Sequence, residues 1–327
     1  MSSTALKLDQ FIKVEDGTPN ERLLGLIDKH SGRTRRAFLK AVAFIKNERT
    51  LGELADLLSV GRIDVALESV ERAMRTVANT VSNTAIATGA STAEVIAENL
   101  NVAFSFNQVN ERAIGIVQRS NFELIRNFTQ EQTRATQRAI LDGLNTGANP
   151  IEQARRFRDS IGLTDRQQST VGNFRRLLQE GDTGALTRGL RDKRFDGTIR
   201  RVFAAGEKLT ESQVSTMTTR YADRLLKHRS EVIARTESLR AVNQADHEAW
   251  VQATEEGVVK KEELIREWVP ANDFVVRDSH EAMRGQEAIL EEPFISGLGN
   301  QLMFPGDPAA PGEDTINCRC VITTRIK

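Results

Sequence analysis

Hydrophobic side chains recur at helical spacing through the first half of the chain, and this periodicity limits the fold more than any other feature. The clearest series is Ile63, Leu67, Val70, Met74 and Val77, whose steps alternate between four and three residues. Such steps place the five side chains on one face of a helix, where they can pack against a core. Further helices are predicted at residues 21–46, 93–118, 122–144 and 151–160.

Polar residues indicate where several of these helices begin and end. The run of Thr, Ala and Asn residues at 79–92 predicts a break in the helical pattern. A capping residue accepts hydrogen bonds from the free amides of a first helical turn, and three such starts are visible. They are Asn149-Pro150, Thr164 to Gln167, and Thr210 to Gln213.

The pattern changes in the C-terminal part of the chain. A long helix is predicted at 219–253, and short apolar or β-branched runs follow it, separated by Gly and Pro residues. The expected strands are 265–269, 274–276, 294–295, 302–304 and 320–324. The predicted fold class is therefore α+β and predominantly α, with an elongated helical N-terminal region and a small C-terminal α+β module. The expected parts are a helical region at 1–180, a basic glycine-containing linker at 181–206 and the module at 207–327.

Composition argues against several classes of protein. Lys plus Arg and Asp plus Glu number 45 each, so the chain as a whole has no charge that favours nucleic acid or a membrane. Two cysteines in 327 residues exclude a disulfide scaffold and favour the reducing cytoplasm. The N-terminus lacks a signal-peptide pattern and no apolar run is long enough to span a bilayer, so we expect neither secretion nor membrane insertion.

One segment departs from this neutral balance. Residues 181–206 are rich in glycine and contain more cations than their three aspartates can neutralise. Such a segment is most often a solvated connecting loop, and the alternative is a patch that binds DNA phosphates or an acidic partner surface. The basic residues are Arg188, Arg191, Lys193, Arg194, Arg200 and Arg201.

Both cysteines lie in the run Cys318-Arg319-Cys320, about forty residues after His280. In a strand, Cys-X-Cys spacing puts the two thiols on one face. With His280, and with Asp273 or His247 as a fourth donor, they could hold a structural zinc ion.

Two other interpretations of the same residues stay open. In one, His280 forms a hydrogen bond in a turn and the thiols pack as small apolar groups. In the other, a cysteine acts as a nucleophile with His280 as its base and Asp273 as the group that orients the base. A disulfide between the two cysteines is not expected, because it would close a very small strained ring.

The predicted long helix also has a polar stripe. Thr236, Arg240, Asn243 and His247 step by four, three and four residues and so lie on one face. Arg235 and Glu237 flank Thr236, and if this face is buried their charges need partners within the protein.

Taken in order, these residues and several others resemble the signature of a known family. The series is Ile233-Ala234-Arg235-Thr236-Glu237, Arg240, Asn243, Trp268, Asp273, Arg277, His280, Met283, Gly285, Pro305-Gly306-Asp307 and Asn317-Cys318-Arg319-Cys320. It is similar to the phage Mu protein F-like family, the minor head or head-morphogenesis proteins of tailed bacteriophages. The similarity covers the C-terminal third, and the run Leu190 to Phe195 extends it upstream.

The resemblance implies a minor capsid protein without enzymatic activity. Such a protein is present in few copies, acts with the portal protein and with scaffold or major capsid protein, and can leave the head with the DNA. Its expected location is the host cytoplasm during assembly and then the capsid interior or portal region. The alternatives are a Cys/His-dependent or metal-assisted hydrolase, and a DNA-contacting protein of the head interior that uses the basic segment.

Overall fold

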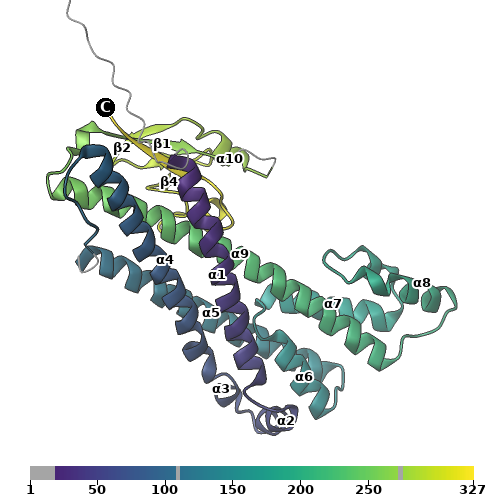
Figure 1. Ribbon diagram of the computed structural model, residues 1–327. Helices are drawn as coiled ribbons and strands as arrows, with labels where there is room; N and C mark the ends of the chain where they lie inside the picture. Colours follow the sequence, from purple (N-terminus) through teal and green to yellow (C-terminus); the bar gives the residue numbers. More distant parts are fainter. Residues whose placement is uncertain (1–18, 108–110, 272–274) are drawn as a thin grey trace, which may run out of the picture. The chain divides into compact units, whose positions relative to one another are not determined.

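The computed structural model describes residues 19–107, 111–271 and 275–327, which are mostly helical (Figure 1). The long helices are α1 (Pro19–Asn47), α4 (Ser69–Leu100), α5 (Glu111–Asn145) and α9 (Glu211–Glu255). The shorter helices are α2 (Leu51–Ser59), α3 (Ile63–Ala66), α6 (Pro150–Ser160), α7 (Asp165–Glu180), α8 (Asp196–Ala204), α10 (Asp278–Glu281) and α11 (Gly312–Thr315). The strands are β1 (Leu264–Val269), β2 (Glu287–Ile289), β3 (Phe294–Ile295), β4 (Gln301–Leu302) and β5 (Val321–Ile326). The predicted fold class, α+β and predominantly α, is confirmed.

The chain divides into two compact units, and each is assembled from separated segments. Unit 1 contains residues 1–36, 78–122 and 232–327, and unit 2 contains residues 37–77 and 123–231. Helices α1, α4, α5 and α9 each contribute residues to both units. The linear division expected at residues 180 and 206 is a different partition, and it stays a prediction. None of the described helices has the length and apolar content that crossing a membrane requires.

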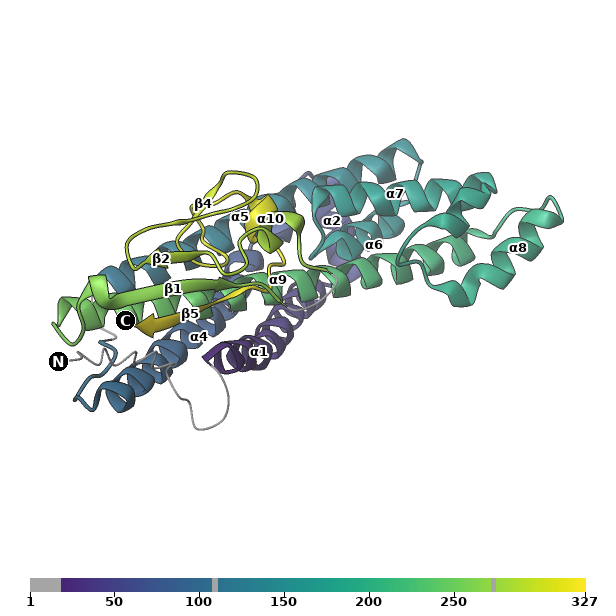
Figure 2. The ribbon, with the colours of Figure 1, turned by 90° about the horizontal axis from the view of Figure 1, so that it is seen from above.

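Unit 1 contains a three-stranded antiparallel sheet in the order β2-β1-β5, beside the C-terminal part of α9 in both ribbon views (Figure 2). The central strand β1 pairs with β5 so that Trp268 lies opposite Ile322. Both side chains belong to a buried apolar cluster that also contains Leu239 of α9 and Leu23 of α1. The sheet therefore shares its core with helices from distant parts of the sequence.

Unit 2 is helical. The ring of Phe38 in α1 meets the ring of Phe128 in α5 edge to face, with centroids 5.5 Å apart. Gly162, between α6 and α7, has a φ of 90°, and a Cβ there would lie 2.6 Å from Leu226 Cδ1 and 3.0 Å from Val42 Cγ1. Only glycine fits this turn, because both its backbone conformation and its neighbours exclude a side chain.

The three predicted helix starts are confirmed. Asn149 Oδ1 accepts from the backbone N–H of Glu152 at 2.9 Å, with Pro150 at the first position of α6. Full capping boxes precede the other two helices, and the N3 amides donate at 3.1 Å to Thr164 and at 3.2 Å to Thr210. The long helix α9 consequently begins at Glu211, eight residues before the predicted start.

The predicted break at 79–92 is wrong, because α4 continues through it. Threonine is a weak helix former in general, but its hydroxyl can be satisfied inside a helix. Thr84 and Thr88 are buried, and each donates to the carbonyl four residues earlier, at 3.0 and 2.9 Å. Their methyl groups are then free to pack against the core.

Two other helix boundaries differ from the expectation. The stripe that begins at Ile63 is not continuous, because α3 ends at Ala66 and α4 starts at Ser69. The helix expected at 93–118 is also interrupted: α4 ends at Leu100, and Asn101 adopts a left-handed φ of 51° that cannot continue a helix.

Among the expected strands, the one at 294–295 is found with the same bounds, and those at 265–269 and 320–324 are found with shifts of one or two residues. Phe274 lies outside the described residues, and Val275 and Val276 are not in a strand. Strand β4 covers 301–302 instead of 302–304. Strand β2 was missed, because its three residues are too few to show an alternating pattern.

Candidate functional site

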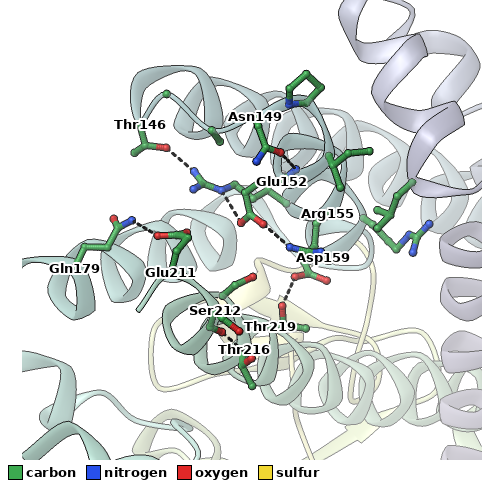
Figure 3. A pocket seen from close by; sticks show the side chains of 18 of the residues that line it. Thr146, Asn149, Glu152, Arg155, Asp159, Gln179, Glu211, Ser212, Thr216 and Thr219 are labelled. Carbon is green, nitrogen blue, oxygen red and sulfur yellow. Dashed lines mark hydrogen bonds and ion pairs between the residues drawn. The ribbon is translucent and has the colours of Figure 1, made fainter. Parts of the chain in front are cut away.

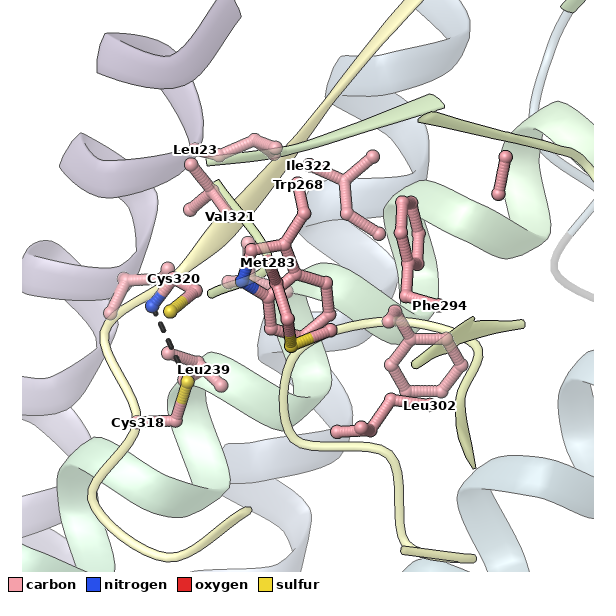
Figure 4. Packing of buried hydrophobic residues seen from close by; sticks show 14 residues of the cluster. Leu23, Leu239, Trp268, Met283, Phe294, Leu302, Cys318, Cys320, Val321 and Ile322 are labelled. Atoms are coloured by element: carbon pink, nitrogen blue, oxygen red, sulfur yellow. Dashed lines mark hydrogen bonds between the residues drawn. The ribbon is translucent and has the colours of Figure 1, made fainter. Parts of the chain in front are cut away.

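His280, Cys318 and Cys320 come together in the core of unit 1. The two sulfur atoms lie 3.5 Å (Cys318) and 3.4 Å (Cys320) from the same ring nitrogen, His280 Nδ1. All three residues are at most 2 % exposed. Figure 4 shows the thiols beside Met283 and Trp268, within the apolar cluster.

A turn positions the two thiols. Cys318 and Cys320 precede β5 and do not lie in the strand as expected, because Asn317 adopts a left-handed φ of 60° at this point. Cys318 Sγ accepts a hydrogen bond from the backbone N–H of Cys320 at 3.4 Å. His280 belongs to the short helix α10.

The buried carboxylate of Asp314 lies behind His280. Its Oδ1 is 3.4 Å from His280 Nε2, which is an electrostatic contact longer than an ordinary hydrogen bond. Ser279, Ser296 and Asn300 donate to the carboxylate at 3.2, 2.8 and 2.8 Å. Burial acts to raise the pKa of Asp314, but the hydrogen bonds outweigh it and lower the pKa. Asp314 therefore stays ionised in the core.

Sequence reasoning missed Asp314. An acidic residue in the Pro- and Gly-rich loop just before the cysteines was the only signal that could have indicated it.

The two thiols titrate differently because they interact with each other. The hydrogen bond from the Cys320 thiol, together with His280, holds the pKa of Cys318 well below the ordinary cysteine value. The contact with Cys318 and burial both raise the pKa of Cys320. The pair thus favours one thiolate, at Cys318, that accepts a hydrogen bond from its neighbour.

The order thiol, imidazole, carboxylate is that of a cysteine nucleophile with its base and orienting group. Here, however, the thiols and the imidazole are almost fully enclosed, so a substrate has no access to the sulfur. A nucleophile also needs one thiol at the base, whereas two converge on Nδ1. The geometry suits metal ligation or core packing better than nucleophilic attack.

Of the two predicted fourth donors, His247 does not belong to the group, and Asp273 stays a prediction. The ring of His247 packs against Phe304, with centroids 5.6 Å apart. Asp273 lies outside the described residues. In the part of the chain that the structure describes, the donor group consists of His280, Cys318 and Cys320.

Thr236 and Arg235 of α9 hold the turn that contains the cysteines. The backbone N–H of Asn317 donates to Thr236 Oγ1 at 2.9 Å, and Arg235 donates to Asn317 Oδ1 at 2.7 Å. The Thr-Glu and Asn-Cys elements of the sequence series therefore meet in space.

Arg240 of α9 holds the Pro305-Gly306-Asp307 turn. Its Nε donates to the carbonyl of Gly306 at 3.1 Å, and it also pairs with Glu237 at 3.4 Å. A Cβ on Gly306 would lie 2.8 Å from Leu239 Cδ2, so glycine allows the turn to contact the helix. Asp307 closes the turn by accepting from the backbone amides of Met303 and Ala309 at 2.7 and 2.9 Å.

Two further residues of the series are buried beside these turns. Asn243 is 3 % exposed and donates to the carbonyl of Leu239 at 3.0 Å. Trp268 packs edge to face against Phe294 and His280, with centroids 5.3 and 5.6 Å apart.

Replacing Asn317 with alanine is expected to lower the free energy of unfolding of unit 1 by about 1–3 kcal/mol. The change removes the contact with Arg235 and puts a poorly suited residue in the left-handed conformation. Chemical denaturation followed by tryptophan fluorescence measures the loss, because both tryptophans lie in unit 1. Asn317→Asp is the matched control, since aspartate tolerates this conformation and still accepts from Arg235. Equal stability of the two variants would contradict the assignment.

The basic segment at 181–206 is folded in unit 2 and is not the loop expected. It contains two 3-10 turns, Thr183–Thr187 and Lys193–Phe195, and helix α8. A polypeptide this rich in glycine can still fold, because its aspartates cap these short helices: Asp182 and Asp192 accept from backbone amides two residues later.

Ion pairs neutralise much of the charge of this segment. Arg191 pairs with Asp196 at 2.8 Å, and Arg194 pairs with Asp192 at 2.6 Å. The hydrogen bonds from Arg194 lower the pKa of Asp192 to about 2. Arg200 lies 3.9 Å from Asp196. The DNA-binding interpretation of the six basic residues stays a prediction. Three of them, Arg191, Arg194 and Arg200, already contact aspartates of the same segment.

Unit 2 also contains an open groove of about 1310 Å³ (Figure 3). Its walls come from residues 146–159 and from the first turns of α9, and they contribute both charges and hydroxyl groups. Thr219 donates to Asp159 at 2.7 Å, and burial raises the pKa of that carboxyl. None of the candidate site residues predicted from the sequence lines this groove, whereas the helix start at Asn149 and Pro150 does.

One comparison with known proteins gives a match. Residues 134–323 match the family model described as Phage Mu protein F like protein. The match covers more than half of the 327 residues and extends from within α5 into β5, well upstream of the C-terminal third. Neither a curated protein nor a solved structure matches. The chain therefore belongs to the Phage Mu protein F like family, a family of phage head morphogenesis proteins.

Proposed function

We propose that the protein is a minor structural component of the phage head, present in few copies. It acts with the portal protein and with scaffold or major capsid protein while the head assembles. The observation that carries this proposal is the family match over residues 134–323, which includes helices α6, α7 and α8 of unit 2 as well as most of the sheet of unit 1.

The contacts of the family-like residues support a structural role. Thr236 and Arg240 of α9 bind the turns at Asn317 and Gly306, and Trp268 fills the core between them. The polar groups of these side chains form contacts within the module. A protein of this kind contributes a shaped surface to an assembly, and its polar signature needs no substrate.

Two alternatives have weaker support. The support for a hydrolase is the order Cys–His–Asp. The thiols of Cys318 and Cys320 are enclosed in the core, which argues against their reaction with a substrate. A DNA-contacting role draws on the basic segment, where Arg191 and Arg194 are already paired with aspartates. DNA binding that weakens steeply with salt, and that is lost when Arg188 and Arg201 are neutralised, would restore the second alternative.

The test is the protein content of purified proheads and mature heads. Mass spectrometry with isotope-labelled peptides should find the protein in both particles, in numbers comparable with the portal protein and far below the major capsid protein. Interrupting its gene should reduce the yield of infectious heads. Absence from both particles would overturn the proposal.

Proheads assembled without portal protein test the proposed partner. They should contain much less of the protein. An unchanged amount would mean that the protein binds scaffold or major capsid protein and not the portal protein. Comparing full heads with heads emptied by DNA ejection shows whether the protein leaves with the genome.

A further inference from the structure

We propose that His280, Cys318 and Cys320 bind one zinc ion, which joins the loop between β1 and β2 to the turn before β5. This inference concerns the folding of the module and goes beyond the proposed role in the head.

The spacing of the donor atoms is the first argument. Zn–S bonds of about 2.3 Å and Zn–N bonds of about 2.0–2.1 Å, meeting at a tetrahedral angle, separate nitrogen from sulfur by about 3.6 Å. The two sulfurs lie 3.5 and 3.4 Å from His280 Nδ1, and all three donor atoms lie within 4.8 Å of one another. Both nitrogen–sulfur distances therefore fit three corners of a zinc tetrahedron.

The convergence on a single nitrogen is the second argument. In a neutral imidazole, Nδ1 has either one proton or one lone pair, so it can hydrogen-bond only one of the two sulfurs, and without a metal the other depends on the contact between the thiols. A cation at the centre satisfies both sulfurs and the nitrogen at once. Two thiolates and an imidazole are also the donors that select zinc over magnesium or calcium.

The carboxylate behind the imidazole is the third argument. When Nδ1 binds a metal, Nε2 carries the proton, and a carboxylate beyond it fixes the ring and makes it a stronger ligand. Asp314 lies 3.4 Å from Nε2 and is fully buried. Three hydrogen bonds hold it there, from Ser279, Ser296 and Asn300.

Burial assigns the ion a structural role. His280, Cys318 and Cys320 are 1–2 % exposed, so neither water nor substrate exchanges freely at this centre. The ion would close a loop of about forty residues, and such closure stabilises a fold mainly by restricting the unfolded chain. Among the residues that the structure describes, these three form the donor group, and the fourth ligand is not among them.

The experiment measures metal in the full-length protein, purified under reducing conditions without chelator. Inductively coupled plasma mass spectrometry should find about one zinc per chain. The double variant Cys318→Ser/Cys320→Ser and the variant His280→Ala should each lose it. His228→Ala, which changes an exposed histidine of α9, is the matched control and should retain it.

Cobalt(II) keeps the proposal testable if those variants fail to fold. Titrating the metal-free wild-type protein with cobalt(II) should give visible bands of a tetrahedral centre and a near-ultraviolet sulfur-to-cobalt band that saturates at one ion per chain. Absence of both zinc and this sulfur band in reduced protein would overturn the proposal, as would zinc retained by the double cysteine variant.

Asp314→Asn tests the positioning role of the carboxylate. It should weaken zinc binding about 10- to 100-fold while the sulfur-to-cobalt band keeps its intensity at saturating metal. Unchanged zinc affinity would show that Asp314 only supports the fold and does not orient His280.

Discussion

Replacing Arg266 with methionine is expected to lower the free energy of unfolding of unit 1 by about 3 kcal/mol or more. Arg266 lies in the central strand β1 and is 1 % exposed. Its guanidinium donates to the carbonyls of Met303 at 2.6 Å, Ile289 at 2.8 Å and Glu292. Each carbonyl left without a partner costs about 1–3 kcal/mol.

The opposing effect is the cost of burying the charge. Burial lowers the pKa of Arg266 to about 10, so methionine relieves some desolvation. The substitution leaves the backbone carbonyls in place without a donor. The cost of these unpaired carbonyls should exceed the gain from removing the buried charge. Arg266→Lys should give an intermediate loss, because a single nitrogen cannot reach three separated carbonyls.

Denaturation followed by the fluorescence of Trp250 and Trp268 measures this effect, since both lie in unit 1. Arg325→Met is the control: its pair with Glu287 is partly exposed, so its loss should cost less than about 1 kcal/mol. An Arg266→Met variant as stable as this control would contradict the assignment.

In unit 2, replacing Glu152 with alanine is expected to cost about 3 kcal/mol. Glu152 pairs with Arg175 at 3.0 Å and with Arg156 at 3.3 Å, and both arginines are less than 10 % exposed. Burial and the nearby Arg156 already lower the pKa of Arg175. Without the carboxylate, two buried cations would face each other, and breaking a buried pair in this way costs about 3–5 kcal/mol. The lower end applies because Glu211 also contacts Arg175, at 3.1 Å.

Hydrogen exchange of the backbone amides in residues 123–231 measures this loss, because unit 2 contains no tryptophan. Glu152→Gln should fall between wild type and alanine, since it keeps the hydrogen bonds and removes the charge. Glu180→Ala removes an exposed pair with Arg176 and should change protection by less than about 0.5 kcal/mol. If alanine and glutamine behaved alike at position 152, charge would not be the cause.

Local signals in the sequence predicted local structure well. The cap at Asn149 and the boxes at Thr164 and Thr210 depend on hydrogen bonds within four residues, so the sequence contains all the information needed. The break expected at 79–92 failed for a tertiary reason: the buried Thr92 donates to Asp246 of α9 at 2.8 Å, and no local pattern shows this contact.

The candidate site was predictable only in part. The sequence indicates His280 and the cysteines because few residue types have their chemistry. It does not indicate Asp314, since an acidic residue near Pro and Gly residues is usually solvated, and only the fold surrounds it with Ser279, Ser296 and Asn300. The partners of Arg266 are backbone carbonyls, which no residue type reveals.

The position of β5 has a consequence for synthesis on the ribosome. The central strand β1 has β5 as one neighbour, and Thr323 of β5 bonds to Asn20, 303 residues earlier. Leu23 shares the core with Val321 and Ile322. Asn20 and Leu23 therefore lack their partners in β5 until that strand has been synthesised. Contacts between residues so far apart in the sequence form slowly. A chain that stopped before Val321 would lack one of the two strands that pair with β1, and Leu23 would lose part of its core.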